Sequence, residues 1–108
     1  QVAVFSGNHG VTTQGVSAFP QEVTAQMVLN FEYGGAAINQ MCKTFDAKLD
    51  VVALDLDSPT NDFTCEAAMS EVECIDALKT GWNAVDENTD LFVAGEMGIG
   101  KTNSEAGI

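Results

Sequence analysis

The stretch His9-Gly-Val-Thr-Thr-Gln-Gly-Val-Ser-Ala-Phe-Pro-Gln-Glu-Val-Thr-Ala-Gln-Met27 decides the fold predicted for this chain. It follows a short apolar segment, Val2–Phe5, and a helical pattern opens within it at Pro20. Glycines between a strand and a helix let the backbone adopt positive φ and approach a ligand, and proline suits the first turn of a helix. This order is typical of the ligand-binding edge of an open α/β sheet. An ordinary glycine-rich connection fits the same local residues.

Two more segments have the composition of buried strands. Leu49–Leu56 contains the run Val51-Val-Ala-Leu54, and Leu91–Ala94 is apolar throughout. Apolar runs without alternation indicate strands that are covered on both faces, as in a parallel sheet. We therefore predict three strands, over Val2–Phe5, Leu49–Leu56 and Leu91–Ala94.

The spacing of apolar residues predicts helices between these strands. A first helix runs from Pro20 to Tyr33 and stops at Gly34. A second covers Ala36–Phe45, and a third begins with the capping box Ser70-Glu-Val-Glu73. The residues that we expect to be buried are Val23, Met27 and Phe31 in the first helix, Ala37, Ile38, Met41, Cys42 and Phe45 in the second, and Cys74, Ile75, Leu78, Trp82 and Val85 in the third.

Strands that are joined by helices pair in parallel, with right-handed crossovers. The predicted fold is therefore α/β: a three-strand parallel Rossmann-like sheet with crossover helices. A chain of 108 residues can hold one domain with a modest core. Because Gln1 leads directly into a strand and the helical segment Thr102–Ile108 is short, we expect residues 1–108 to be a single partial α/β domain, an incomplete part of a larger one.

Charge and cysteine content limit the class of protein. With 4 basic and 16 acidic residues, the formal net charge of −12 repels nucleic acid and anionic membranes, so we expect neither as a partner. Cys42, Cys65 and Cys74 form no CxxC pair, and we interpret them as reduced thiols of a cytoplasmic protein. His9 is the only histidine and no ligand spacing appears, so a zinc site is not expected. We also expect no other metal and no cofactor. No apolar run is long enough to span a bilayer.

Polar residues follow each predicted strand. Asn8 and His9 come after the first, Asp55 and Asp57 after the second, and Glu96 after the third. Parallel strands bring these residues to one carboxyl edge, where open sheets place their sites. This shared edge indicates where a site could lie, but it does not identify the ligand or the reaction. His9 could stabilise its loop by a hydrogen bond or take part in catalysis, and the aspartates could serve only to cap the next turn.

The segment Gly95-Glu-Met-Gly-Ile-Gly-Lys-Thr102 satisfies the P-loop pattern G-x-x-x-x-G-K-[ST] between a strand and a helix. In a P-loop, Lys101 would neutralise β- and γ-phosphates and Thr102 would hold magnesium. Against this interpretation, no strand follows that could supply a Walker-B aspartate. In either interpretation, glycine amides and a helix N-terminus would hold a phosphate.

Four separated motifs resemble the nicotinate-nucleotide–dimethylbenzimidazole phosphoribosyltransferase family. They are VFSGNHGVTTQGVSAFPQEVTAQMVLNF at the N-terminus, Gly34–Asn39, Pro59–Thr64 and Gly95–Gly100. Members of that family are considerably longer than this chain. The resemblance implies transfer of 5-phosphoribose from nicotinate mononucleotide to 5,6-dimethylbenzimidazole, giving α-ribazole 5′-phosphate and nicotinate. It also implies a homodimer, and a general-base glutamate near the family's C-terminus that these 108 residues do not include, so we expect the chain alone to be nearly inactive.

The resemblance also assigns site residues. It places Glu96 at the reacting centre as an auxiliary glutamate that could stabilise an oxocarbenium-like transition state. The residues implied to bind substrate are Val16, Phe19 and Met27 around the aromatic base, and Gly98, Gly100, Lys101 and Thr102 around the phosphate. Val16, Phe19 and Met27 could equally be core residues. The chain departs from the common family motif Gly-Glu-Met-Gly-Ile-Gly-Asn-Thr-Thr at Lys101 and Asn103.

Overall fold

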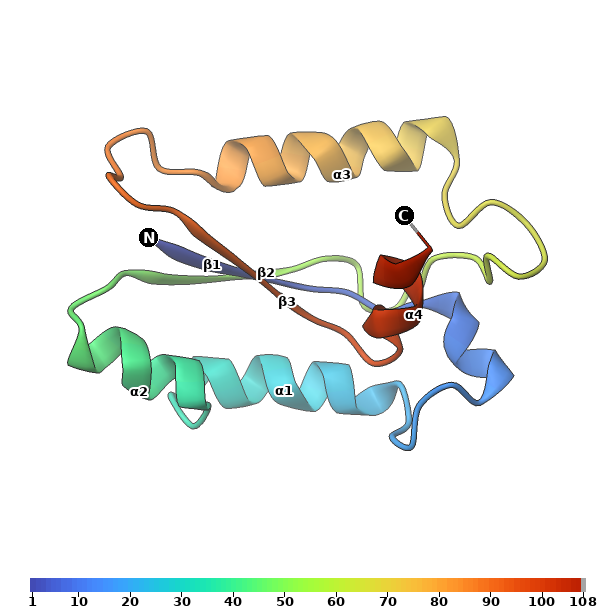
Figure 1. Cartoon of the computed structure of the whole chain (residues 1–108), viewed down its shortest axis with the longest axis horizontal. Helices are drawn as coiled ribbons and strands as arrows, with labels where there is room; N and C mark the ends of the chain where they lie inside the picture. Colours follow the sequence, from blue (N-terminus) through green and yellow to red (C-terminus); the bar gives the residue numbers. More distant parts are fainter. Residues whose placement is uncertain (108) are drawn as a thin grey trace.

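A sheet of three strands lies between two helical layers (Figure 1). The structure is a computed structural model that describes residues 1–107, so Ile108 of the last predicted helical segment lies outside it. The strands are β1 (Val2–Ser6), β2 (Leu49–Ala53) and β3 (Val93–Met97). The helices are the 3₁₀ helix η1 (Gly10–Gln14) and the α-helices α1 (Glu22–Glu32), α2 (Ala37–Thr44), α3 (Glu71–Ala84) and α4 (Lys101–Ala106). The predicted α/β class is confirmed.

The sheet has the order β2-β1-β3, and both pairings are parallel, as predicted. Val4, in the middle of β1, pairs with Val51 of β2 and with Gly95 of β3. The connection from β1 to β2 runs through α1 and α2 on one face, whereas α3 connects β2 to β3 on the other (Figure 1). The strand order therefore reverses about β1, and open α/β sheets bind ligands at the carboxyl ends of the strands beside such a reversal.

The face covered by α1 and α2 holds the hydrophobic core. Val4, Phe31 and Ala36 form its centre and are 6–8% exposed. The half-buried residues that pack against this centre are Val2, Met27, Ile38, Leu49, Val51 and Met97. This confirms the predicted apolar face of α1.

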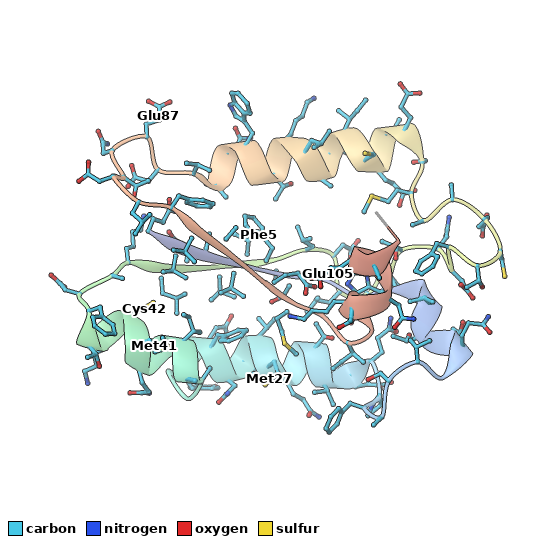
Figure 2. The ribbon with its side chains drawn as sticks, viewed as in Figure 1. Phe5, Met27, Met41, Cys42, Glu87 and Glu105 are labelled. Atoms are coloured by element: carbon cyan, nitrogen blue, oxygen red, sulfur yellow. The ribbon has the colours of Figure 1, made fainter. Side chains whose placement is uncertain are left out.

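The predicted apolar face of α2 is only partly correct. Cys42 points from α2 towards the sheet and is 6% exposed (Figure 2), and Ile38 is half-buried. The prediction is wrong for Ala37, Met41 and Phe45, which are exposed. An α-helix of eight residues makes little more than two turns, so only a narrow part of its apolar stripe reaches the sheet.

The prediction that α3 buries its apolar stripe is wrong. The predicted capping box is present, because Glu73 N–H donates to Ser70 Oγ and Ser70 N–H donates to Glu73 Oε1, both at 3.2 Å. All of α3 is described, yet none of its residues is buried, and Leu78 and Trp82 are 69% and 84% exposed. The same holds for the other members of the expected face, Cys74, Ile75 and Val85, which are exposed.

The half-buried residues of α3 are small and lie on another side of the helix. They are Thr80, Gly81 and Ala84. At 3.6 residues per turn, this side is rotated by more than a quarter turn from the line that joins Leu78 and Trp82. The half-buried side of α3 thus carries small residues, and its large apolar side chains lie on the exposed side.

Strand β3 lies further along the chain than predicted. It spans Val93–Met97 instead of Leu91–Ala94, so Gly95 and Glu96 are paired with β1. Glycine and glutamate are uncommon inside strands. For this reason the apolar run Leu91–Ala94 did not locate the end of β3 correctly. At Gly95 the absence of a side chain fits the sheet, because a Cβ there would lie 3.3 Å from Val4 Cγ2.

Other boundaries also differ from the prediction, and one short helix was not predicted. Strand β2 ends at Ala53 rather than Leu56, and α1 begins at Glu22 rather than Pro20. The helical turn η1, Gly10–Gln14, lies within the stretch interpreted as a loop. Short 3₁₀ turns are frequent as connectors, and such a turn has no long apolar period that would reveal it in the sequence.

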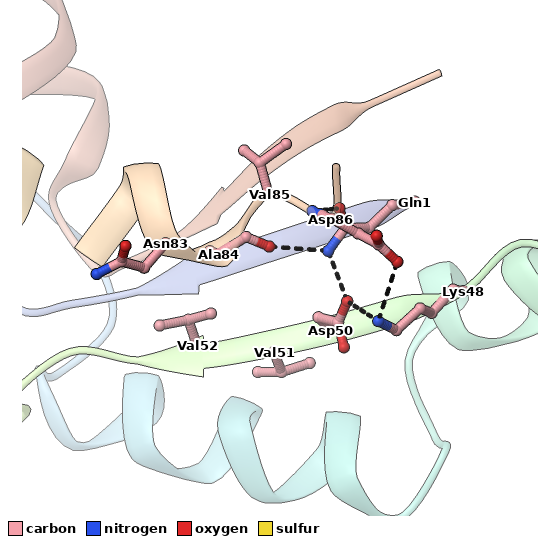
Figure 3. A pocket seen from close by; sticks show the side chains of 9 residues that line it. All are labelled: Gln1, Lys48, Asp50, Val51, Val52, Asn83, Ala84, Val85 and Asp86. Atoms are coloured by element: carbon pink, nitrogen blue, oxygen red, sulfur yellow. Dashed lines mark hydrogen bonds and ion pairs between the residues drawn. The ribbon is translucent and has the colours of Figure 1, made fainter. Parts of the chain in front are cut away.

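At the amino edge of the sheet, polar side chains join β1, β2 and the end of α3 (Figure 3). Gln1 Nε2 donates to Asp50 Oδ2 at 2.7 Å and to Ala84 O at 2.9 Å, and Gln1 Oε1 accepts from Asp86 N–H at 2.8 Å. Lys48 Nζ lies 3.4 Å from Asp50 Oδ2. These contacts hold the C-terminal end of α3 against the sheet, at the edge opposite the candidate site.

Candidate active site

Two glycine-containing loops meet at the carboxyl edge of the sheet, one after β1 and one after β3. Gly7 N–H donates to Met97 O at 3.1 Å. A Cβ at Gly98 would collide with the carbonyl oxygen of Gly7. Only glycine lets the two loops approach this closely. The predicted meeting of the loops that follow the first and third strands is therefore present.

Glu96 reaches this edge from within β3. It pairs with Phe5, whose ring lies between the sheet and α3 (Figure 2). Glu96 Oε1 lies 3.4 Å from His9 Nε2, and Glu96 Oε2 lies 3.4 Å from Lys101 Nζ. The Lys101 ammonium also donates to the Glu96 carbonyl oxygen at 2.9 Å. Lys101 is thus turned back towards Glu96, which the sequence did not reveal.

His9 connects three elements at this edge. Its Nε2 faces Glu96 of β3, and its Nδ1 lies 3.0 Å from Ser104 Oγ of α4. Its carbonyl oxygen accepts hydrogen bonds from Thr12 N–H at 3.2 Å and Thr12 Oγ1 at 2.9 Å. These two bonds stabilise the first turn of η1. The backbone of His9 therefore stabilises the loop, while its ring is directed to the carboxylate.

Three buried side-chain oxygens near this edge accept no hydrogen bond from the described residues: Ser6 Oγ, Asn8 Oδ1 and Glu96 Oε2. Asn8 is fixed by its other end, since Nδ2 donates to Leu56 O at 2.8 Å. Lys101 is within ion-pair distance of Glu96 Oε2 but not in hydrogen-bond geometry. A buried oxygen left without a donor costs about 1–3 kcal/mol. The edge therefore suits a ligand that donates hydrogen bonds.

The loop Gly98–Gly100 has the amides expected of an anion site. Ile99 N–H donates to the buried Thr24 Oγ1 at 3.2 Å, which fixes the loop. Among the described residues, the amides of Gly98 and Gly100 have no recorded acceptor. Gly100 has φ +82°, a conformation that favours glycine. Thr102 is exposed in the first turn of α4.

A cavity of about 790 Å³ opens beside Glu96, and sequence reasoning missed its apolar wall. His9, Glu96, Lys101 and Ser104 form a polar side. The wall residues from the segment before α3 and from α3 itself are Thr60, Phe63, Glu66, Ala67, Ala68, Met69 and Cys74. Glu105 and Gly107 complete the lining. The one sequence signal for this wall is the motif Pro59–Thr64, to which no binding role was assigned.

Asp62 holds that segment against η1. Its Oδ2 accepts from Gln14 Nε2 at 2.7 Å, and its Oδ1 accepts from Thr64 N–H at 3.0 Å and Thr64 Oγ1 at 2.7 Å. The hydrogen bonds from Gln14 and then Thr64 stabilise the ionised form and hold the pKa of Asp62 below its usual value. Phe63, which lines the cavity, is next to this anchored residue.

The three residues predicted around the aromatic base have different surroundings. Val16 lies beside the carboxyl edge, with its Cγ2 3.7 Å from the position of a Cβ on Gly100. Phe19 is 64% exposed. Met27 packs against the core on the α1 face of the sheet, which supports the alternative that it is a core residue. The structure thus places Val16 near Gly100, and a shared role for all three stays a prediction.

Comparison with known proteins decides the family. A sequence model described as phosphoribosyltransferase, DBI_PRT, matches residues 1–108, the whole chain. The chain belongs to this family. It is 65% identical over 108 residues to the nicotinate-nucleotide–dimethylbenzimidazole phosphoribosyltransferase of Roseobacter denitrificans, and 64% identical to that of Ruegeria sp.. These matches cover all of this chain and 32% of each relative, so the chain spans about a third of their length.

Solved structures support the same DBI_PRT assignment. A crystal structure of nicotinate-nucleotide–dimethylbenzimidazole phosphoribosyltransferase from Thermus thermophilus superposes with a TM-score of 0.90 at 38% sequence identity. The match covers 97% of this chain and 38% of that one. A second structure of that protein from the same organism gives a TM-score of 0.85. The fold of this DBI_PRT chain therefore corresponds to a part of the solved enzyme.

Nothing in these comparisons favours the P-loop interpretation of Gly95–Thr102. In this DBI_PRT chain, Gly95 and Glu96 are strand residues, and Lys101 is directed to Glu96. Within residues 1–107, no three His, Cys, Asp or Glu side chains gather as metal ligands do. In the same residues, no helix has the length and apolar character needed to cross a membrane.

Proposed function

We propose that this chain is the nucleotide-binding part of an enzyme that moves the 5-phosphoribosyl group from nicotinate mononucleotide to 5,6-dimethylbenzimidazole. The products are α-ribazole 5′-phosphate and nicotinate. The observation that carries the proposal is Glu96, whose buried Oε2 lacks a donor beside a large cavity. The relatives' names supply the substrates.

The geometry suits the two chemical demands of this transfer. The reacting ribose carbon gains positive charge as nicotinate leaves, and a carboxylate held next to it, as we propose for Glu96, stabilises that charge. The phosphate has to bind against a net charge of −12, so local amides must hold it. Gly98 and Gly100 offer such amides, and Lys101 adds a cation 3.4 Å from Glu96. We propose that the exposed Thr102 lies at the outer end of this phosphate site.

Isothermal titration calorimetry tests the proposal. We expect nicotinate mononucleotide to bind and Mg-ATP not to bind. Glu96→Gln should weaken binding of nicotinate mononucleotide or dimethylbenzimidazole without changing the far-UV circular dichroism. Glu32→Gln, which removes an acid from an exposed position at the end of α1, is the matched control and should bind normally. Mg-ATP binding that depends on Lys101 and ignores Glu96 would overturn the proposal.

We further propose that residues 1–108 form the N-terminal half of the enzyme's large domain, that the enzyme is cytoplasmic, and that it is a homodimer. The relatives' greater length supports the first point, and three free thiols support the second. The exposed apolar stripe of α3 supports self-association, because such surfaces commonly mark interfaces. Sedimentation at several concentrations tests this, and a compact monomer at all of them would contradict self-association of this chain.

A further inference from the structure

We propose that His9 is a positioning residue for Glu96, that the Glu96 carboxylate sets the tautomer of His9, and that Ser104 holds the ring in place from its other side. The inference rests on the proposed function only for the statement that Glu96 faces substrate. The chain Ser104–His9–Glu96 runs from α4 through the loop after β1 to β3, so residues far apart in the sequence form one contiguous set.

The hydrogen-bond chemistry of the ring sets the tautomer. A carboxylate only accepts, so the ring nitrogen that faces it must carry a proton. His9 Nε2 faces Glu96 Oε1 at 3.4 Å and is therefore N–H. In the neutral ring, Nδ1 is then an acceptor, and Ser104 Oγ, 3.0 Å away, can donate to it. The opposite tautomer would place a lone pair against the carboxylate and is disfavoured.

Gly98 provides independent support, because its lack of a side chain leaves room for this pair. A Cβ there would lie 2.7 Å from Glu96 Oε1 and 2.9 Å from His9 Nε2. Both distances are too short for carbon against these atoms. The backbone at Gly98 thus leaves space for the His9–Glu96 contact as well as for the close approach of the two loops.

The consequence concerns which oxygen of Glu96 meets the ligand. His9 holds Oε1, which leaves Oε2 as the oxygen without a hydrogen-bond donor. The separation of 3.4 Å is longer than the roughly 2.7–2.9 Å of a charge-assisted hydrogen bond, and such contacts commonly tighten when a ligand binds. The other charged groups that line this cavity are Lys101, Glu66 and Glu105, and none has a recorded hydrogen bond to the ring.

The tautomer can be measured directly. Because His9 is the only histidine, a two-bond ¹⁵N–¹H correlation spectrum shows a single imidazole. We expect a proton on Nε2 in the neutral ring, and a mixture of tautomers in Glu96→Ala, which removes the carboxylate that faces Nε2. Thr13→Ala is the control, since it removes a hydrogen bond of η1 without touching the ring. A proton on Nδ1 in the wild type, or no change in Glu96→Ala, would overturn the tautomer assignment.

Binding of nicotinate mononucleotide tests the positioning role. We expect His9→Ala to weaken binding about tenfold, the effect of one charge-assisted hydrogen bond. His9→Gln, whose amide can still donate to Glu96, should recover most of the loss. His9→Ala should have no further effect when Glu96 is already Gln. An additive loss in the double variant, or no recovery with Gln, would overturn the positioning role. If the wild-type chain does not bind this nucleotide, the proposed function fails, and the tautomer spectrum still decides whether His9 Nε2 donates to Glu96.

Discussion

The two faces of the sheet differ in how well they are covered. On one face, α1 and α2 enclose Val4, Phe31 and Ala36, which are at most 8% exposed. On the other face lies α3, a longer helix with an equally clear apolar stripe, and its Trp82 is 84% exposed. The difference shows that an amphipathic pattern identifies a helix face that tends to be buried. The pattern does not identify which element or molecule buries that face.

The largest effect that separates the two faces should come from truncating one aromatic residue on each. Phe31→Ala should lower the free energy of unfolding by about 3–5 kcal/mol, since it leaves a cavity in the core. Trp82→Ala should change it by no more than about 0.5 kcal/mol, because the side chain has little cover to lose. Urea unfolding followed by far-UV circular dichroism measures both changes.

A large loss of unfolding free energy in Trp82→Ala would contradict the difference between the two faces, since it would show that the α3 stripe is covered in solution. Repeating the unfolding at several protein concentrations identifies the source of that cover. A midpoint that rises with concentration indicates a second copy of the chain, whereas a constant midpoint indicates packing within one molecule.

The next effect uses the same substitution at two glycines. Gly98→Ala should destabilise the protein by about 1–3 kcal/mol, because its Cβ would collide with the Gly7 carbonyl and lie 2.7 Å from Glu96 Oε1. Gly81→Ala, inside α3, should stabilise it by about 0.5–1 kcal/mol, since the new methyl group meets no atom within 4 Å. Thermal and urea unfolding give both values. Destabilisation by Gly81→Ala would mean that α3 lies closer to the sheet than described.

The smallest effect concerns the segment that leads to α3. Hydrogen bonds from Gln14 and Thr64 lower the pKa of Asp62 in the folded chain from its unperturbed 3.8. A lowered folded-state pKa contributes stability above pH 3.8 and loses it as the pH falls through the folded value. Asp62→Asn should therefore show a smaller decrease of melting temperature than the wild type as the pH falls from about 5 to about 3. Identical pH profiles would show that these contacts do not persist in solution.

Much of the fold followed from the sequence because local and global signals agreed. The apolar runs at Val2–Phe5 and Val51–Leu54 located two strands, and the Ser70–Glu73 capping box located the start of α3. Strand β3 was misplaced because its second half, Gly95–Met97, is held by pairing with β1 and not by strand propensity. Such pairing is a long-range interaction that no local window of sequence contains.

The candidate site was predictable to a similar degree. The carboxyl edge and Glu96 follow from topology and from the motif, since an acid among glycines has little structural use. The sequence did not reveal the ring of His9 between Glu96 and Ser104, because 95 positions separate His9 from Ser104. The apolar wall around Phe63 was also missed, because its residues lie in a loop without helical or strand periodicity.

Trp82 gives the exposed stripe a practical consequence. It is the only tryptophan in the chain, so all indole fluorescence comes from this one position on α3. An indole that is 84% exposed emits as it does in water, and any cover that excludes solvent shifts its emission to shorter wavelength. The chain therefore carries its own optical reporter of docking at this end of α3. The cavity beside Glu96 meets α3 at Cys74, and Trp82 does not line it.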